Sequence, residues 1–268
     1  MDRDVSRNRG RVEYAIRAEG IGKSFGRLEV LKSASLWGES GKITTLLGRN
    51  GSGKTTLMKI TVGVLRADYG VISVFGDVRE HQSLPRLARA GLMYVPQEQL
   101  VSPNYSVRDH VTALVTTFGS DGVDEAISEM GIESLLDQKV RSLSGGERMR
   151  VSLALALARA PRVLIADEPL VGLSPHNQEA LGTSLRTLAE RGTAVVTCGH
   201  DARILLGISD TILWCVAGTT HHIGTPTEAL AHDQFQREYL GPGFSADEER
   251  SETPRQDDGT NDEPDRPG

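Results

Sequence analysis

Short runs of aliphatic residues alternate along the chain with segments in which apolar residues recur every three or four positions. The runs predict β-strands and the recurring positions predict helices. Strands that alternate with helices are typical of an α/β fold with a largely parallel sheet. The predicted strands are residues 12–17, 30–36, 42–47, 71–75, 91–95, 162–166, 194–198 and 211–216.

One helix is predicted directly after Pro175. Leu181, Leu185 and Leu188 share one face of it, which makes the segment amphipathic. Ser174 precedes the proline, and a serine followed by proline is typical of a helix cap and first turn. We therefore expect a surface helix that begins at Pro175 and is capped by Ser174.

The middle of the chain is expected to be helical. Residues 151–158 are apolar nearly all round, so we expect this helix to be buried between layers. Strand signals are absent between Gln97 and Ser144, and the helical patterns there cover residues 107–117, 123–130 and 132–136. The pattern predicts a helical subdomain, inserted at about residues 97–155.

Composition places the chain among soluble globular proteins with an aliphatic interior. Of its 268 residues, 38% are hydrophobic, 25% are charged and 4% are aromatic. The net charge of −6 resides at the C-terminus, because residues 246–268 contain nine acids and three bases. We expect a disordered acidic tail at 246–268 and an N-terminal arm at 1–12. The neutral remainder argues against a broad nucleic-acid-binding surface.

Several features favour a cytoplasmic protein. The longest nearly apolar stretches, 153–158 and 211–218, are far shorter than the roughly 18 residues that cross a bilayer. The N-terminus is charged where a signal peptide would be apolar. Cys198 and Cys215 lie in apolar runs without metal-ligand or disulfide spacing, which fits a reducing compartment.

The run GRNGSGKTT, from Gly48 to Thr56, follows an apolar strand and opens a helix. Its glycines let backbone N–H groups turn toward phosphate oxygens, and the helix N-terminus adds positive potential. Lys54 would reach the β- and γ-phosphates, and the Thr55 hydroxyl would bind Mg²⁺. The strand, loop and helix context outweighs the alternative of a plain glycine-rich turn, so the sequence predicts nucleotide binding.

A second motif, RVLIADEP, is an apolar strand that ends in two carboxylates. Such a strand presents its acids at the carboxyl edge of the sheet, where α/β proteins bind ligands. We interpret Asp167 as the carboxylate on the metal side and Glu168 as the general base or the group that orients water. Two solvated acids in a strand-end turn are the alternative when the motif is considered alone.

A third motif, LSGGE, covers Leu143 to Glu147 and begins the buried helix. A serine and two glycines at a helix start form a second end that can bind anions, although an ordinary capped helix explains the motif in isolation. One nucleotide does not need two such ends in one chain. The arrangement makes sense if this end meets the γ-phosphate of a nucleotide held by another subunit in a two-fold dimer.

In this combination and order the three motifs resemble the ATP-binding subunits of ATP-binding-cassette (ABC) transporters, from about Ala15 to Phe244. The resemblance implies an α/β P-loop NTPase fold: a RecA-like parallel sheet, an antiparallel N-terminal β region and an inserted helical subdomain, within an ATPase domain at 13–245. It implies ATP and Mg²⁺ as cofactors. The residues it assigns to nucleotide binding are Phe25, Gly48, Arg49, Asn50, Gly51, Ser52, Gly53, Lys54, Thr55, Thr56, Ser144, Gly145 and Gly146.

The resemblance also gives roles to residues that would be unremarkable alone. Phe25 matches the aromatic residue that stacks on adenine, and His200 matches the histidine that contacts the γ-phosphate. Gln97 matches the glutamine that contacts Mg²⁺ and water and senses the membrane partner. The implied catalytic residues are Glu168, His200 and Gln97, and the implied metal ligands are Thr55, Gln97 and Asp167.

One position departs from the family pattern. Ser174 stands where the family usually has an aspartate, in the segment that crosses to the other subunit. Because serine can still cap the following helix, we expect the fold to be retained. The coupling between subunits that the aspartate supports is what the substitution affects. We expect hydrolysis to persist.

The resemblance implies partners that this chain lacks. Separate transmembrane permease subunits would dock on the helical region between Gln97 and Ser144, and place the subunit on the inner face of the cell membrane. The chain would pair as a homodimer, or as a heterodimer with another ABC ATPase subunit, and no nucleic-acid partner is expected. The segments YVPQE and YLGPGF look most like the branch with branched-chain amino acid importers and the lipopolysaccharide-export ATPase.

Two other functions compete with transport. One is a soluble ABC ATPase that acts on DNA or ribosomes, but this chain has neither a sustained heptad insertion nor a second cassette. The other is a regulatory module that binds nucleotide without hydrolysis, which Ser174 and the acidic tail suggest. Glu168 and His200 argue against the regulatory module.

Overall fold

The computed structural model describes residues 14–79, 83–97, 101–241 and 244. The arm expected at 1–12 and the acidic tail expected at 246–268 lie outside these residues. No helix within the described residues is long and apolar enough to cross a membrane.

The described strands form one sheet in the order β5-β4-β1-β2-β10-β9-β3-β8-β7-β6. Strands β6, β7, β8, β3 and β9 run parallel, whereas β1, β2, β4 and β5 pair antiparallel. The strands are β1 (Tyr14–Phe25), β2 (Leu28–Glu39), β3 (Ile43–Leu47), β4 (Tyr69–Val74), β5 (Asp77–Arg79), β6 (Leu92–Val95), β7 (Val163–Ala166), β8 (Ala194–Gly199), β9 (Thr211–Val216) and β10 (Thr219–Gly224).

This topology confirms the predicted α/β class with an antiparallel N-terminal region, and it corrects several boundaries. The six- and seven-residue strands predicted at 12–17 and 30–36 are twelve-residue strands. The first was cut short because Gly20 and Gly22 interrupt its apolar pattern, although Gly22 accommodates the Tyr69 ring. Strands β5 and β10 were not predicted, since the first has three residues and the second is mostly polar.

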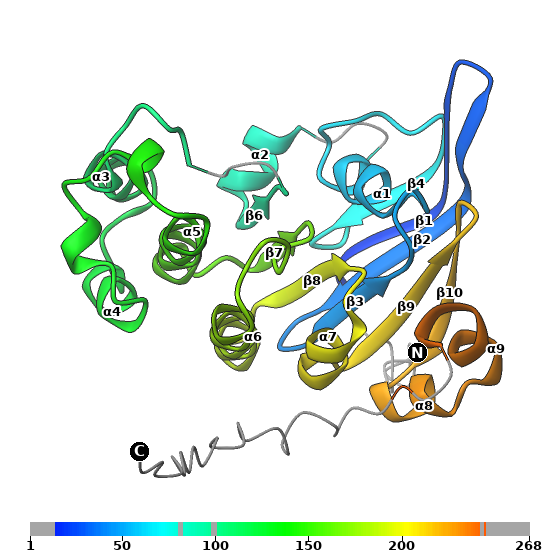
Figure 1. Ribbon diagram of the computed structural model, residues 1–268. Coiled ribbons are helices and arrows are strands. Elements are labelled where there is room, and N and C mark those ends of the chain that lie inside the picture. The colour runs from blue at the N-terminus through cyan, green and yellow to red at the C-terminus, as the bar shows by residue number, and fades with distance from the viewer. Residues whose placement is uncertain (1–13, 80–82, 98–100, 242–243, 245–268) are drawn as a thin grey trace, which may run out of the picture.

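The helices lie on both faces of the sheet, with a separate helical lobe beside its β6 edge (Figure 1). The lobe contains α3, α4 and α5, together with two short 3-10 turns. The helices are α1 (Lys54–Thr61), α2 (Leu84–Arg89), α3 (Val107–Phe118), α4 (Val123–Glu129), α5 (Gly145–Arg159), α6 (Pro175–Glu190), α7 (Ala202–Ile208), α8 (Pro226–Ala231) and α9 (Asp233–Phe235), with 3-10 turns at Glu133–Leu135 and Val140–Ser142 and a π-helical turn, η3, at Gln236–Leu240.

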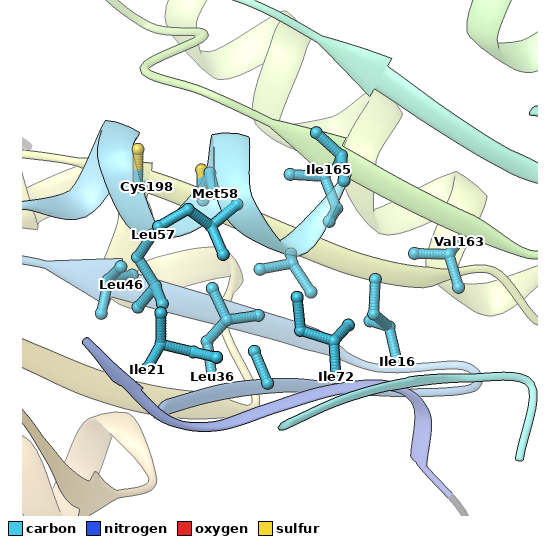
Figure 2. Packing of buried hydrophobic residues seen from close by; sticks show 14 of the residues in the cluster. Ile16, Ile21, Leu36, Leu46, Leu57, Met58, Ile72, Val163, Ile165 and Cys198 are labelled. Atoms are coloured by element: carbon cyan, nitrogen blue, oxygen red, sulfur yellow. The ribbon is translucent and has the colours of Figure 1, made fainter. Parts of the chain in front are cut away.

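Alternate residues of the parallel strands pack against two different groups of helices. Leu46 of β3 joins Leu57 and Met58 of α1 in a cluster that includes the antiparallel strands (Figure 2). Ile43 and Leu47, on the opposite face of the same strand, join the leucines of α6 and α7. Leu57 and Met58 are fully buried, and burial of each stabilises the fold by about 1.5–3 kcal/mol. This packing fixes α1, and with it the loop that precedes α1, against the sheet.

Helix α5 is buried on two sides, as its all-round apolar pattern predicts. Leu153, Ala156 and Leu157 pack into the cluster that contains the leucines of α6. Val151 and Leu155 pack into the core of the helical lobe. The helix therefore belongs to both units. The lobe expected at 97–155 and the sheet are joined through its side chains.

Candidate functional site

The phosphate loop connects β3 to α1 and has a conformation that requires its glycines. Gly51 has a φ of 79° and Gly53 a φ of 108°, values that favour glycine. A Cβ atom on Gly48 would lie 2.4 Å from the carbonyl oxygen of Cys215, and one on Gly53 would lie 2.6 Å from Leu31. Residues 48–56 thus curl at the carboxyl end of the central strand and open a helix, the arrangement that binds phosphate.

Lys54 lies within this loop with its side chain only 3% exposed. Its Nζ donates hydrogen bonds to the carbonyl oxygens of Gly48, at 2.7 Å, and Arg49, at 3.1 Å. The same atom is 3.6 Å from Oε1 of Glu168. A buried ammonium needs such acceptors, and they hold the positive charge where phosphate oxygens would bind.

Asp167 directly follows β7 and accepts hydrogen bonds from three elements. The Thr55 hydroxyl donates to Oδ1 at 3.0 Å, and the Tyr94 hydroxyl donates to Oδ2 at 3.3 Å. The Cys198 thiol donates to Oδ1 at 3.1 Å. Burial and the Asp167 charge raise the pKa of both Tyr94 and Cys198, so each keeps its proton and remains a donor.

Glu168 is the point where the other predicted catalytic side chains meet. Gln97 donates through Nε2 to Oε2 of Glu168 at 3.2 Å, and Nδ1 of His200 is 3.8 Å from the same oxygen. Glu168 itself has a φ of 48°, a left-handed conformation that side chains rarely adopt. Backbone strain of this kind concentrates at functional sites, where surrounding contacts hold it.

A pocket of about 130 Å³ adjoins this carboxylate, and Glu168, Cys198 and His200 line it. The loop, the two carboxylates, Gln97 and His200 are thus brought together at the carboxyl edge of the sheet.

The signature loop, which we define as Ser144 to Glu147, is built differently. The Ser144 hydroxyl accepts from the Glu147 N–H, and the Glu147 carboxylate accepts from the Ser144 N–H, so the two form a capping box for α5. Gly145 lines a pocket of about 750 Å³ together with Gln97 and Gly172. Phosphate-loop residues line a different pocket, of about 380 Å³. The two anion-binding ends therefore do not line one pocket.

Phe25 ends β1, and the β1–β2 turn follows it. Its side chain is 47% exposed, and Nζ of Lys23 lies 5.5 Å from the ring centroid. The strand that follows this turn passes the phosphate loop at Leu31, beside Gly53. An exposed aromatic ring at this position is available for stacking.

The comparisons with known proteins decide the family. The model of the family described as "ABC transporter" matches residues 31–171, which is more than half of the chain and includes all three motifs. The chain belongs to the ABC transporter family. It is an ATP-binding subunit of that family, with ATP hydrolysis coupled to transport.

Curated relatives of this ABC ATPase cover most of its length. The lipopolysaccharide export system ATP-binding protein LptB of Acidithiobacillus ferridurans is 35% identical over 237 residues, 85% of this chain and 98% of the relative. The zinc import ATP-binding protein ZnuC of Halorhodospira halophila is 34% identical over 232 residues, 85% of each chain. A crystal structure of an ATP-binding cassette in its ADP conformation has a TM-score of 0.74 at 21% identity, covering 85% of this chain and 99% of its own. That likeness confirms the predicted ABC ATPase fold.

The structure adds detail that sequence reasoning missed. Tyr94 and Cys198, both bonded to Asp167, were not among the predicted site residues of this ABC ATPase. Cys198 is the second-last residue of β8, which runs parallel to β7, so its place at the carboxyl edge beside Asp167 was the signal available in the sequence.

Ser174 takes the N-cap position of α6, but its hydroxyl makes no capping hydrogen bond. Its carbonyl oxygen takes part in the backbone hydrogen bonding of the helix, because it accepts from the N–H of Gln178 at 3.0 Å. The expected side-chain cap is therefore wrong.

Proposed function

We propose that two copies of this subunit, or one copy and a related ABC ATPase, close on ATP to form composite sites. In each site the phosphate loop of one chain would face the signature loop of the other. The observation that supports this is the separation of the two anion-binding ends, which line different pockets of one chain. A two-fold arrangement uses both ends twice.

Within each site, the roles follow from the contacts of the side chains. Lys54 would exchange its loop carbonyl partners for phosphate oxygens, and Glu168, next to both Gln97 and His200, would orient and deprotonate the attacking water. His200 would contact the γ-phosphate. Phe25 would stack on the adenine ring.

The residues around Asp167 fit a magnesium ion. The Thr55 hydroxyl and the Asp167 carboxylate are 3.0 Å apart, and both are oxygen donors of the kind that Mg²⁺ prefers. Thr55, Asp167 and Gln97 would hold the ion. When bound, Mg²⁺ neutralises charge that develops on the phosphates.

We propose that transmembrane permease subunits dock on the helical region between Gln97 and Ser144, and hold this chain at the inner face of the cell membrane. Gln97 supports this placement, because it reaches Glu168 through its side chain and lines the 750 Å³ pocket beside α5. Movement of a partner against the lobe would then reach the catalytic carboxylate. Curated relatives are named for export of lipopolysaccharide and for import of zinc, so the same ATPase chemistry serves different cargoes.

Mixing two inactive variants tests the composite site. Lys54→Ala disables the phosphate loop, and Gly145→Asp places a carboxylate in the signature loop, where a Cβ atom meets no neighbour. Gly207→Asp is the matched control, because it is a helical glycine with equally open space. Gly146 is unsuitable, since its Cβ would lie 2.7 Å from the Asn177 amide nitrogen.

In a heterodimer of Lys54→Ala and Gly145→Asp chains, isolated through two different tags, one site has both ends intact. ATPase activity should reappear there, while both homodimers stay inactive. If the heterodimer is as inactive as the two homodimers, both ends act within one chain, and the proposal fails.

The Glu168→Gln form with ATP, captured from detergent-solubilised membranes of the native cell, separates transport from its competitors. Stoichiometric recovery of integral membrane subunits supports transport. Recovery of ribosomal, DNA-associated or soluble regulatory proteins alone would support a soluble ABC ATPase or a regulatory module.

A further inference from the structure

A π-helical turn near the C-terminus, Gln236–Leu240 (η3), packs against the phosphate loop. Nη2 of Arg49 donates a hydrogen bond to the carbonyl oxygen of Glu238 at 2.7 Å. The N–H of Gly241 bonds to the carbonyl oxygen of Gln236 at 2.8 Å and closes the turn. Glu238 and Tyr239 line the 380 Å³ pocket with the phosphate loop. The family model ends at residue 171, so this turn lies outside it.

Tyr239 is held in this turn by its ring. The ring stacks on Phe235 with centroids 5.1 Å apart, and Phe235 is fully buried against Trp214 at 5.6 Å. Aromatic pairs of this kind fix the orientation of both rings. The hydroxyl of Tyr239 therefore has a defined place beside the site.

The turn joins two parts of the proposed ATP site. The Tyr239 hydroxyl donates to the carbonyl oxygen of His200 at 2.9 Å, and the neighbouring Glu238 carbonyl accepts from Arg49 of the phosphate loop. Burial raises the pKa of Tyr239 and the Gly48 backbone lowers it, with a net rise, so the hydroxyl keeps the proton that it donates to His200.

His200 has few other restraints on its side chain. The side chain is 48% exposed, and its ion-pair distance to Glu168 is 3.8 Å, beyond ordinary hydrogen-bond length. The backbone therefore decides where the imidazole stands. The β3–β8 pair holds Gly199 beside Leu47, and the Tyr239 hydroxyl adds a contact to the His200 carbonyl itself, just beyond the end of the strand.

We infer that Tyr239 is a positioning residue for ATP hydrolysis: it sets the place of His200 relative to the loop that holds the phosphates. The inference rests on the proposed contact between His200 and the γ-phosphate. Tyr239 itself need not touch the nucleotide. Loss of its hydroxyl would leave the His200 carbonyl without this partner and let the His200 segment shift.

Tyr239→Phe removes the hydroxyl and keeps the ring on Phe235. Small misplacements of a catalytic group reduce turnover strongly, so we expect kcat to fall about tenfold and KM for ATP to rise by no more than about fivefold. Tyr69→Phe is the matched control, because the Tyr69 hydroxyl also donates to a backbone carbonyl, that of Lys32, but forms no hydrogen bond with the His200 segment within the described residues. Tyr69→Phe should leave kcat and KM unchanged. A structural role of the ring alone predicts that Tyr239→Phe behaves like the wild type, which would overturn the inference.

A second readout does not depend on turnover. In the Glu168→Gln background, calorimetry gives the affinities for ATP and ADP, which differ by the γ-phosphate. Tyr239→Phe should weaken ATP about fivefold and leave ADP unchanged, as should His200→Ala, and the double variant should lose no more than His200→Ala alone. Additive losses, or equal losses for ATP and ADP, would overturn the positioning role.

The same measurement separates the two proposals. If His200→Ala leaves the ratio of ATP affinity to ADP affinity unchanged, the proposed γ-phosphate contact of His200 is wrong. If His200→Ala lowers this ratio and Tyr239→Phe does not, only the role of Tyr239 is wrong.

Discussion

The phosphate-loop half and the signature-loop half of the proposed ATP site are held by different kinds of contact. Lys54, Asp167 and Glu168 exchange hydrogen bonds or ion-pair contacts with residues that are distant in sequence. Ser144 and Glu147 bond to each other within one helical turn. The first half is thus a product of tertiary structure. The second is a local structure that the helical lobe carries as a unit.

This difference has a mechanical meaning. A local capping box survives movement of the lobe, because none of its own bonds crosses to the sheet. The phosphate-loop half cannot be displaced piecemeal without breaking buried hydrogen bonds. Substitutions in the first half should therefore change chemistry, and those in the second should change helix stability and the encounter between subunits.

The largest expected effect is that of Glu168→Gln. Removal of the carboxylate eliminates the proposed general base, so we expect ATP turnover to fall about 100-fold or more, measured as steady-state phosphate release. Glu147→Gln is the control from the other half, because glutamine also serves at this position of a capping box. It should retain turnover. Wild-type turnover in Glu168→Gln would place water activation on another residue.

A smaller effect is expected at Cys198, which is fully buried and donates to Asp167. Cys198→Val removes that donor at similar volume, so the Mg²⁺ concentration for half-maximal ATPase activity should rise about fivefold, the equivalent of one hydrogen bond. Cys198→Ser keeps a donor and should stay near the wild type. An unchanged Mg²⁺ dependence in Cys198→Val would show that the thiol does not support Asp167.

Thr197 provides the control on the same strand. Its hydroxyl is buried without a hydrogen-bond partner among the described residues. Thr197→Val should therefore leave the Mg²⁺ dependence unchanged, and raise the free energy of unfolding by about 1 kcal/mol.

The smallest effect is expected in the signature loop. Ser144→Ala removes the cap of α5, so the free energy of unfolding should fall by about 1 kcal/mol in urea titrations.

Bonds from the Ser144 backbone and hydroxyl lower the pKa of Glu147 below its usual value of 4.5. A lowered pKa contributes stability above that value and loses it as pH falls. The free energy of unfolding of the wild type should therefore exceed that of Glu147→Gln above about pH 4.5, and the difference should shrink as the pH falls below this value. A difference that does not shrink at lower pH would contradict this account.

The two halves also differ in how far sequence alone could predict them. Ser144 to Glu147 form their capping box from neighbouring residues, so the motif contains the whole structure. The phosphate loop and the two carboxylates after β7 could be placed at one sheet edge because parallel strands end there. Their partners Tyr94, Cys198 and Tyr239 could not be foreseen in the same way. Tyr239 bonds to a backbone carbonyl 39 positions away, which no side-chain pattern specifies.

The fold shows the same limit. The parallel strands and α5 have apolar patterns strong enough to identify from sequence. Strand β10 has exposed His221 and His222 and pairs with β2 through a single residue pair, Thr219 with Ser33, so its position depends on its neighbours. Likewise, the lack of a capping bond from Ser174 depends on a side-chain rotamer that the sequence does not specify.

Helix α5 can transmit movement from one end to the other, because its two ends contact different parts of the molecule. At its C-terminal end the Arg159 guanidinium lies 3.8 Å from the Phe118 ring and bonds to the carbonyl oxygen of Ala88 at 2.6 Å. Its N-terminal end carries Ser144 and the two glycines. A fifteen-residue helix is about 22 Å long, so a rotation of about 10° around the Arg159 end displaces Ser144 by about 4 Å. This displacement exceeds the length of a hydrogen bond. A small tilt of the lobe is therefore enough to form or break hydrogen bonds between the N-terminus of α5 and a phosphate.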